Sequence, residues 1–306
     1  APVQKAPQNG LPHYSQSIGQ DSQFILENAM SQNVIPIHRE NEVIGILLLE
    51  YTQTEGNIES STEFLVRLCD HAAIAIANAR LYTEVQEANQ AKSEFISFVS
   101  HELKTPMTSI RGYTDLLTSG IVGSINENQE NFLSTIRSNV DRMATLVSDL
   151  TDVSRIEAGR VRLEFESVPV SEVISEVVRS IGAQIAGKEQ SLEITVPEDL
   201  PPMWGDRTRL IQILTNLISN ANKYTPAQGQ INVMAEETKQ GITKAIHLIV
   251  KDNGYGINPE HQKNIFQKFY RSDDPKVRDT PGTGLGLNIS KQLIELQGGQ
   301  IWFESV

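Results

Sequence analysis

The sequence predicts a multidomain protein in which a helical hairpin separates two parts that are α+β in class. Its 306 residues suit two or three domains at about 100–200 residues each. Runs of β-branched residues occur toward both ends, and between them apolar residues recur every three or four positions, as on one face of a helix. Hydrophobic residues make up 39% and charged residues 21%, which is ordinary for a folded chain and excludes wholesale disorder.

Charge and cysteine content exclude several classes of protein. The net charge of −12 leaves no basic excess to neutralise nucleic acid, although a nucleotide pocket needs only a few local cations and backbone N–H groups. No apolar run reaches the ~20 residues of a membrane-spanning helix, so we expect no membrane segment in this stretch. The single cysteine, Cys69, excludes an internal disulfide and fits a cytoplasmic setting. Both ends of the chain look cut. We therefore expect the parent protein to have further residues, and these can attach it to a membrane.

The N-terminal part begins with a predicted β-hairpin. Residues 33–51 have the pattern of strand, polar turn and strand, with Arg39–Glu42 as the turn. A helix is expected from Ser60, where the run Ser-Ser-Thr-Glu supplies helix-start signals. Cys69 lies within this helix, and packing is its expected role. Polar residues continue the helical pattern to Ser93 without glycine or proline, which predicts a long connecting helix.

Two further apolar faces predict a helical hairpin. The first runs from Phe95 to Leu117 and the second from Phe132 to Val153, and a glycine-containing loop separates them. Two helices joined by a short loop cannot bury both faces alone. Pairing with a second copy of the chain into a dimeric four-helix bundle buries them, so we expect a homodimer.

After Gly159 the pattern alternates between strands and helices. A sheet with helices packed on one face satisfies such an order. The expected strands are 160–165, 191–196, 231–235, 245–251 and 300–304, and the expected helices are 170–187, 207–224 and 285–297.

His101 is the first candidate for chemistry. It lies on the first hairpin helix, about 200° around the axis from Val99 and Leu103, in a polar stripe. A lone histidine is more often an ordinary core or surface residue. An exposed imidazole beside Glu102, however, can be oriented and kept basic by the carboxylate, as a nucleophile requires. Pro106 cannot donate a hydrogen bond to the carbonyl of Glu102, so we expect a kink one turn after His101.

The helix 207–224 supplies a second candidate group. Asn216, Asn220 and Lys223 share one face of this helix, offset from its apolar stripe. Asparagine is a mediocre helix former, so two on one face call for an explanation. Amide oxygens can bind Mg²⁺ and the lysine can reach a phosphate, while surface solvation is the alternative.

Two glycine-containing turns complete the candidate site. Asp252 can accept a hydrogen bond from an amino group, and Gly254 and Gly256 allow the backbone to approach a ligand closely. Thr280–Leu287 contains three glycines that lead into a helix, which suits phosphate oxygens at the helix N-terminus. Alone, such a turn is more often a plain loop.

The order of these motifs resembles that of the sensor histidine kinases of two-component systems, from Ala91 to Val306. The resemblance implies a dimerisation and histidine-phosphotransfer domain at 93–158. It also implies a Bergerat-type (GHKL) ATP-binding α/β sandwich at 159–306, which stops before the family's usual closing strand. The segments match the family's phosphoacceptor, asparagine, first glycine, phenylalanine and second glycine boxes in order: His101–Pro106, Asn216–Lys223, Asp252–Ile257, Phe266–Arg271 and Gly282–Gly286.

The resemblance also implies a role for each matching residue. His101 is similar to the phosphoacceptor, Glu102 to the base that hydrogen-bonds its imidazole, and Thr105 to the residue that positions water for phosphatase activity. Asn220 resembles the Mg²⁺ ligand. The implied partner is an aspartate of a response-regulator receiver domain. The remaining matches resemble the residues that bind ATP: Asn216, Lys223, Tyr224, Asp252, Gly254, Gly256, Arg271, Gly282, Gly284 and Gly286.

The front of the chain and the activity each leave alternatives. Residues 1–78 resemble part of a GAF sensor domain and 79–92 a signalling helix; a GAF module can bind a cyclic nucleotide, a tetrapyrrole or nothing. The same ATP pocket serves a conformational ATPase in type II topoisomerases and related chaperones, which lack the His-Glu-x-x-Thr-Pro helix. A third reading is a ligand-sensing dimer whose pocket has lost turnover.

Overall fold

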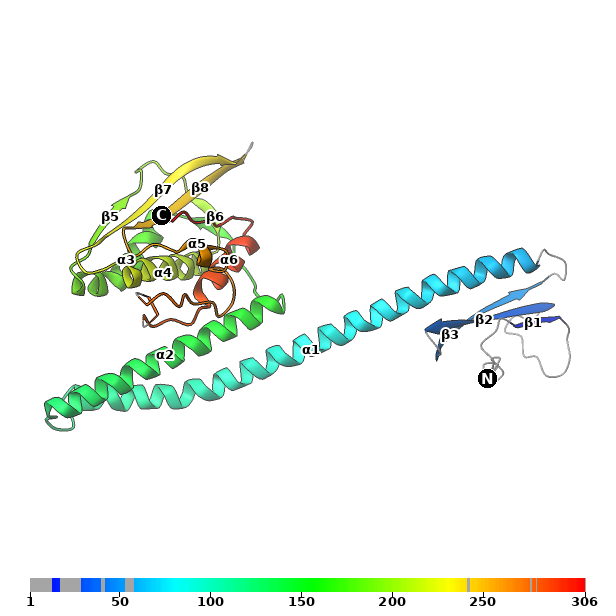
Figure 1. Ribbon diagram of the computed structural model, residues 1–306, viewed down its shortest axis with the longest axis horizontal. Coiled ribbons are helices and arrows are strands. Elements are labelled where there is room, and N and C mark those ends of the chain that lie inside the picture. Colours follow the sequence, from blue (N-terminus) through cyan, green and yellow to red (C-terminus); the bar gives the residue numbers. More distant parts are fainter. Residues whose placement is uncertain are drawn as a thin grey trace. The chain divides into compact units, whose positions relative to one another are not determined.

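The computed structural model describes residues 13–16, 29–39, 42–52, 58–240, 243–275, 277–278 and 280–305. The chain divides into two compact units, Ala1–Gln90 and Ala91–Val306. In the first unit the strands β1 (His13–Gln16), β2 (Ser31–Arg39) and β3 (Glu42–Tyr51) form an antiparallel sheet in that order (Figure 1). Pairing of Arg39 with Glu42 confirms the predicted hairpin.

The helix α1 (Ile58–Thr118) is one uninterrupted helix of 61 residues. The expected connecting helix and the first hairpin helix are therefore a single element, and Pro106 lies inside it. Cys69 is buried, as its packing role predicts, and burial followed by the charge of Asp70 raises the pKa of its thiol. Among the described residues, no helix combines the length and the apolar character that crossing a membrane requires.

In the second unit, α2 (Glu127–Glu157) runs back along the C-terminal half of α1 and forms the predicted hairpin (Figure 1). A capping box between Asn126 and Gln129 begins α2. The two helices are joined by buried hydroxyl pairs as well as by apolar packing. Thr151 donates to the Ser100 hydroxyl at 2.8 Å, and Ser154 donates to the Ser93 hydroxyl at 3.0 Å.

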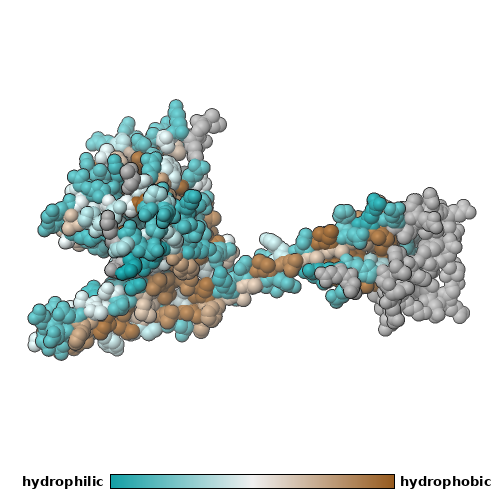
Figure 2. All heavy atoms as spheres, in the orientation of Figure 1, coloured by the Kyte–Doolittle hydropathy of each residue, from teal (hydrophilic) through white to brown (hydrophobic). Residues whose placement is uncertain are grey.

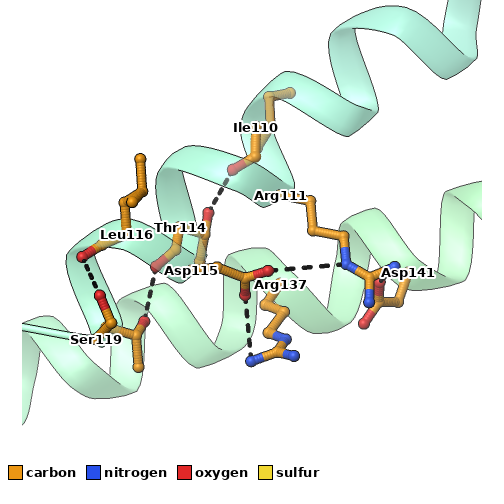
Figure 3. Close-up of polar contacts among 9 residues, drawn as sticks. Ile110, Arg111, Thr114, Asp115, Leu116, Ser119, Arg137 and Asp141 are labelled. Carbon is orange, nitrogen blue, oxygen red and sulfur yellow. Dashed lines mark hydrogen bonds and ion pairs between the residues drawn. The ribbon is translucent and has the colours of Figure 1, made fainter.

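Ion pairs connect the helices near the hairpin loop (Figure 3). Arg111 on α1 lies 3.3 Å from Asp141 on α2, and Arg137 on α2 lies 3.2 Å from Asp115 on α1. All four side chains are about half exposed, so each pair contributes at most about 1 kcal/mol. These pairs fix the register of the hairpin more than they stabilise it.

Large apolar side chains remain exposed along the hairpin (Figure 2, brown). They include most of the residues predicted to form the two apolar faces, and packing within one chain leaves these in contact with water, whereas Val140 and Val153 are buried. The exposed set comprises Phe95, Phe98, Leu103, Ile110, Tyr113, Leu116, Leu117, Phe132, Ile136, Met143, Leu146 and Leu150.

The rest of the second unit is a sheet with helices on one face. The strands β5 (Ser191–Thr195), β7 (Gln230–Gln240) and β8 (Thr243–Asp252) are hydrogen-bonded in that order, with β5 parallel and β8 antiparallel to β7. The strands β4 (Glu166–Val168) and β6 (Met203–Gly205) form a separate antiparallel pair. The helices are α3 (Val170–Gly187), α4 (Arg207–Tyr224), α5 (Pro259–Gln262) and α6 (Gly286–Leu296). The predicted bounds of α3 and α4 are confirmed.

The main core of this part lies between α3, α4 and the sheet. Ile174 and Val177 of α3, Leu214 and Ile218 of α4 and Val233 of β7 are almost fully buried in one cluster. Each such side chain contributes about 1.5–3 kcal/mol through removal from water. The core thereby fixes α4, which carries the asparagine pair, against the sheet.

Two predicted strands are wrong. Residues 160–165 form no ladder, because β6 pairs only with 166–168, and the Glu164 N–H donates instead to the Asp206 carboxylate at 3.0 Å. Residues 300–304 form no ladder either, and side chains hold this segment. Trp302 stacks on His247 with ring centroids 4.9 Å apart, and the Ser305 hydroxyl accepts a hydrogen bond from the Ile257 N–H.

Glu157, at the C-terminal end of α2, joins the hairpin to the rest of the second unit. One carboxylate oxygen accepts from Lys92 at 3.1 Å and the other accepts from Lys268. The hydrogen bond from Lys268, the largest cause, and that from Lys92 hold the pKa of Glu157 below its usual value, against an opposing effect of burial.

We expect Glu157→Gln to lower the unfolding temperature at pH 7 in low salt, by the equivalent of about 1 kcal/mol or less for this partly exposed group. A carboxyl whose pKa is lower when folded stabilises above its unfolded pKa, and this stabilisation is lost as pH falls through the folded pKa. The difference from wild type should therefore stay constant from pH 7 down to the ordinary pKa of glutamate, about 4.3, and shrink only below it. Thermal unfolding followed by circular dichroism measures it, with the exposed Glu198→Gln as control. Equal losses in both variants would contradict the assignment.

Candidate active site

His101 projects from α1 with 81% of its side chain exposed, so it is not a core residue. Its Nδ1 lies 3.3 Å from Oε1 of Glu102. Thr105, one turn further along α1, is also exposed, and the helix continues through Pro106. The structure thus presents an accessible imidazole with a carboxylate on one of its two nitrogens.

The asparagine pair lies where α4 meets α6. The Asn216 amide donates to the Ser290 hydroxyl at 2.9 Å, and the Asn220 amide donates to the Asn216 carbonyl oxygen at 3.5 Å. A Cβ on Gly286 would lie 2.2 Å from that same side-chain oxygen, so any larger residue there would displace the Asn216 amide. Half-burial and these contacts exclude simple surface solvation for Asn216.

Asp252 and the turn after β8 are tied to the end of α4. One Asp252 oxygen accepts from the Gly254 N–H at 2.9 Å, and the other has no hydrogen-bond partner in the described part of the chain. The Tyr255 N–H donates to the Tyr224 carbonyl at 3.2 Å. A Cβ on Gly254 would lie 2.4 Å from the same carbonyl oxygen, and Gly256 has a φ of 69°. Both glycines are therefore required by the backbone.

The second glycine turn packs against the segment around Phe269. Gly284 has a φ of 71°, and a Cβ there would lie 2.8 Å from the Tyr270 carbonyl oxygen. Phe269 itself has a φ of 61°, which is unfavourable for a bulky side chain. At Gly282 there is space for a side chain, because an added Cβ would have the Tyr224 hydroxyl, at 4.0 Å, as its nearest neighbour.

Arg271 closes the loop that leads into this turn. Its guanidinium donates to the carbonyls of Thr280 at 2.6 Å and Arg278 at 2.9 Å. These bonds use part of its donor set and leave other N–H groups for a phosphate. The structure therefore adds a loop-closing role to the predicted phosphate contact.

Tyr224 is half-buried, and Lys223 is exposed but partly shielded from water by its neighbours. Burial lowers the pKa of Lys223, and the charge of Asp149 partly offsets this. Burial raises the pKa of Tyr224, and Arg271 partly offsets that. In such surroundings a cation interacts more strongly with phosphate than it does in bulk water.

Two family descriptions match consecutive parts of the second unit. "His Kinase A (phospho-acceptor) domain" matches residues 91–159, which contain His101, and "Histidine kinase-, DNA gyrase B-, and HSP90-like ATPase" matches residues 205–306. The ATPase description covers DNA gyrase B and HSP90 as well as histidine kinases. The phosphoacceptor description applies to histidine kinases and so distinguishes among these classes. The chain belongs to the sensor histidine kinase family.

Individual relatives of this histidine kinase agree. The circadian input-output histidine kinase CikA of Synechococcus elongatus is 31% identical over 89% of the chain, and the chain spans 39% of CikA. The signal transduction histidine-protein kinase BarA of Escherichia coli is 32% identical over 87% of the chain, which spans 29% of BarA. Full-length ShkA in complex with AMPPNP aligns with a TM-score of 0.55 at 27% identity, over 67% of this chain and 41% of that one. The chain thus covers less than half of each relative.

Sequence reasoning missed one contact of this kinase, between Asp149 on α2 and Thr283 in the second glycine turn. The Thr283 hydroxyl donates to Asp149 at 2.7 Å and accepts from the Leu285 N–H at 3.2 Å. Burial, and then the charge of Asp152, raises the pKa of Asp149, while Thr283 and Lys223 lower it. Asp149, Asp152 and Glu157 lie on one side of α2. This acidic side is the one sequence feature that could have predicted the contact, and it belongs to no recognised motif.

The Asp149 contact brings the glycine turn to the level of the phosphoacceptor. Thr151 bonds to Ser100, which precedes His101, and Asp149 is two residues from Thr151. At a rise of 1.5 Å per residue, Asp149 and His101 differ by less than about one helical turn along the hairpin. The second glycine turn and His101 therefore lie at the same height along the hairpin.

We expect Gly284→Ala to destabilise the kinase more than Gly298→Ala. Both glycines have positive φ, so each substitution carries about 1–2 kcal/mol of backbone strain. Only at Gly284 would the new Cβ also meet backbone atoms at 2.8 Å, whereas nothing lies within 4 Å at Gly298. Thermal unfolding of the two variants measures the difference, and equal losses would show that the close approach at Gly284 is unimportant.

Proposed function

We propose that this chain is the catalytic part of a sensor histidine kinase that transfers the γ-phosphoryl group of ATP to His101 and then to an aspartate of a response-regulator receiver domain. The observation that carries the proposal is an exposed imidazole paired with Glu102, at the same height on the hairpin as the glycine-rich turn.

The contact with Glu102 assigns the roles of the two imidazole nitrogens. With Nδ1–H donating to the carboxylate, Nε2 carries the lone pair and attacks the γ-phosphorus. The Nε2–P bond forms as the bond from the γ-phosphorus to the β–γ bridging oxygen breaks, and ADP leaves. Glu102 compensates the positive charge that develops on the ring. Positioning and charge neutralisation supply the rest of the acceleration.

ATP would occupy the region between α4, the turn after β8 and the second glycine turn. The free oxygen of Asp252 suits the adenine amino group, with Gly254 and Gly256 beside the base. Lys223, Tyr224, Arg271 and the turn Gly282–Gly286 surround the place for the phosphates.

Mg²⁺ fits the oxygen donors present. The side-chain oxygen of Asn220 accepts no hydrogen bond within the described residues, and Asn216 lies beside it. No cluster of three or more His, Cys, Asp or Glu side chains suited to a metal occurs in the described part, so the ion would depend on amide and phosphate oxygens and water. When bound, Mg²⁺ neutralises phosphate charge during transfer.

Other parts of the proposal rest on the surface of the hairpin and on the first unit. The exposed apolar faces of α1 and α2 support a homodimer with a four-helix core. Exposed Thr105, one turn from His101, is placed to position water for dephosphorylation of the partner. We propose a partial GAF-like sensor for the first part, supported by the strands β2 and β3 followed by the start of α1. The proposed domain limits are 1–78, 79–92, 93–158 and 159–306.

We expect His101→Gln to retain nucleotide binding and to lose acid-labile label from γ-labelled ATP, because the glutamine side chain has no nucleophilic nitrogen. Calorimetry with a non-hydrolysable ATP analogue and labelling gels measure the two properties. His71→Gln, an exposed histidine on the same helix, should label like wild type. Undiminished labelling of His101→Gln would refute the phosphoacceptor, and binding without labelling in wild type would favour the sensor alternative.

We expect Asn220→Ala to reduce Mg²⁺-dependent labelling by at least 100-fold, since the ligand that holds the ion beside the phosphates is lost. The rate is measured against Mg²⁺ concentration. Asn139→Ala on exposed α2 is the matched control and should keep the wild-type rate. A wild-type magnesium response in Asn220→Ala would remove Asn220 from the metal site.

A further inference from the structure

A pocket of about 420 Å³ lies where the hairpin continues into the ATP-binding part, apart from every residue assigned above to ATP or to phosphoryl transfer. Four segments line it: α1, α2, the connecting residues 160–162 and the first turn of α4. It has the size of a small-molecule site, for which 300–1,000 Å³ is usual. Its chemistry follows from the side chains these segments contribute.

Four arginines line the pocket, and no aspartate or glutamate does: Arg155, Arg160, Arg162 and Arg209. Arg160 forms an ion pair with Glu94 at 3.5 Å, and Arg209 forms one with Asp152 at 3.8 Å. Both ion pairs are long, and neither Glu94 nor Asp152 lines the pocket. Arg155 and Arg162 have no ion pair among the described residues. In a chain of net charge −12 this is a local positive excess.

Ordinary structural roles account for only part of this cluster. Arg155 lies in the last turn of α2, where a cation interacts favourably with the helix dipole. That reason does not apply to Arg162, in the connecting segment, or to Arg209, in the first turn of α4. Arg209 is held instead by its hydrogen bond to the Gln212 side chain at 2.9 Å and by Asp152 at 3.8 Å. Arg155 and Arg162 line the pocket, are exposed and make no ion pair within the described residues, so their side chains are available to a ligand.

The floor of the pocket offers buried hydroxyl groups. Ser93, Thr151 and Ser154 are each more than nine-tenths buried. Ser93 accepts a hydrogen bond from Ser154, and its own hydroxyl hydrogen has no acceptor within the described residues. It can donate into the pocket. Ile96 and Val161 add a small apolar wall, which suits a ligand with a carbon skeleton.

We propose that this pocket binds a small organic phosphate. Guanidinium groups match phosphate oxygens in paired hydrogen bonds, and arginines with a free hydroxyl donor are the donors that such a group needs. The lining comes from both the hairpin and the ATP-binding part, so the bound anion holds together the arrangement in which Thr283 contacts Asp149. The site is a point at which a metabolite regulates a kinase that acts as proposed above.

Calorimetry with glycerol 3-phosphate tests this on the whole chain, with the ATP site filled by AMPPNP and Mg²⁺. We expect binding to wild type with a submillimolar dissociation constant, and at least tenfold weaker binding to Arg155→Gln/Arg162→Gln. Arg142→Gln/Arg179→Gln, with exposed arginines outside the pocket, should bind like wild type.

Three results would overturn the proposal: no binding to wild type, equal binding to both double variants, or equally tight binding of glycerate, which lacks the phosphate. Thermal unfolding and AMPPNP affinity of the Arg155→Gln/Arg162→Gln variant show that it is folded and loads nucleotide. Because AMPPNP binding and His101 labelling are measured separately, failure of the pocket leaves the kinase assignment standing, and failure of the kinase assignment leaves the pocket measurable.

Discussion

The contact between the C-terminal end of α2 and the beginning of α6 is the constraint on which the arrangement of the site depends. Val153 of α2 is buried in one cluster with Leu285, Ile289 and Leu293, which follow the second glycine turn. Burial of such side chains contributes about 1.5–3 kcal/mol each, more than the exposed ion pairs of the hairpin. The apolar contact thus supplies the energy, and the neighbouring polar contacts determine its geometry.

The polar contacts at this junction reach three different elements. Asp149 bonds to the glycine turn, Asp152 accepts from Gln212 of α4 at 2.7 Å, and Glu157 accepts from Lys268. Each is modest because the groups are only partly buried. A junction with a small apolar core and modest polar contacts can open without unfolding either side. The phosphoryl transfer to a receiver domain that we propose would require such opening, since the receiver domain must reach His101 after the nucleotide has done so.

Much of the fold could be predicted because the spacing of apolar residues along the sequence determines where its helices form. Apolar periodicity predicted the bounds of α3 and α4 to the residue. The order of the motifs predicted the family, and the roles that it implies for His101 and Asn220 remain predictions. The strands expected at 160–165 and 300–304 failed because alternation says nothing about whether a partner strand is within reach. The Asp149–Thr283 contact and the arginine pocket could not be predicted, because their residues come from distant segments that only the tertiary structure brings together.

The continuity of α1 has a mechanical consequence. From Ile58 to Ser100 the helix contains neither glycine nor proline, so no residue along it absorbs torsion. A rotation of α1 about its axis near the N-terminal end is therefore transmitted along the helix to the imidazole of His101. At a helix radius of about 5–6 Å, a rotation of roughly 30° sweeps the side chain through about 3 Å, comparable to the separation of reacting atoms. A stimulus could thereby re-aim the nucleophile without altering a single bond around it.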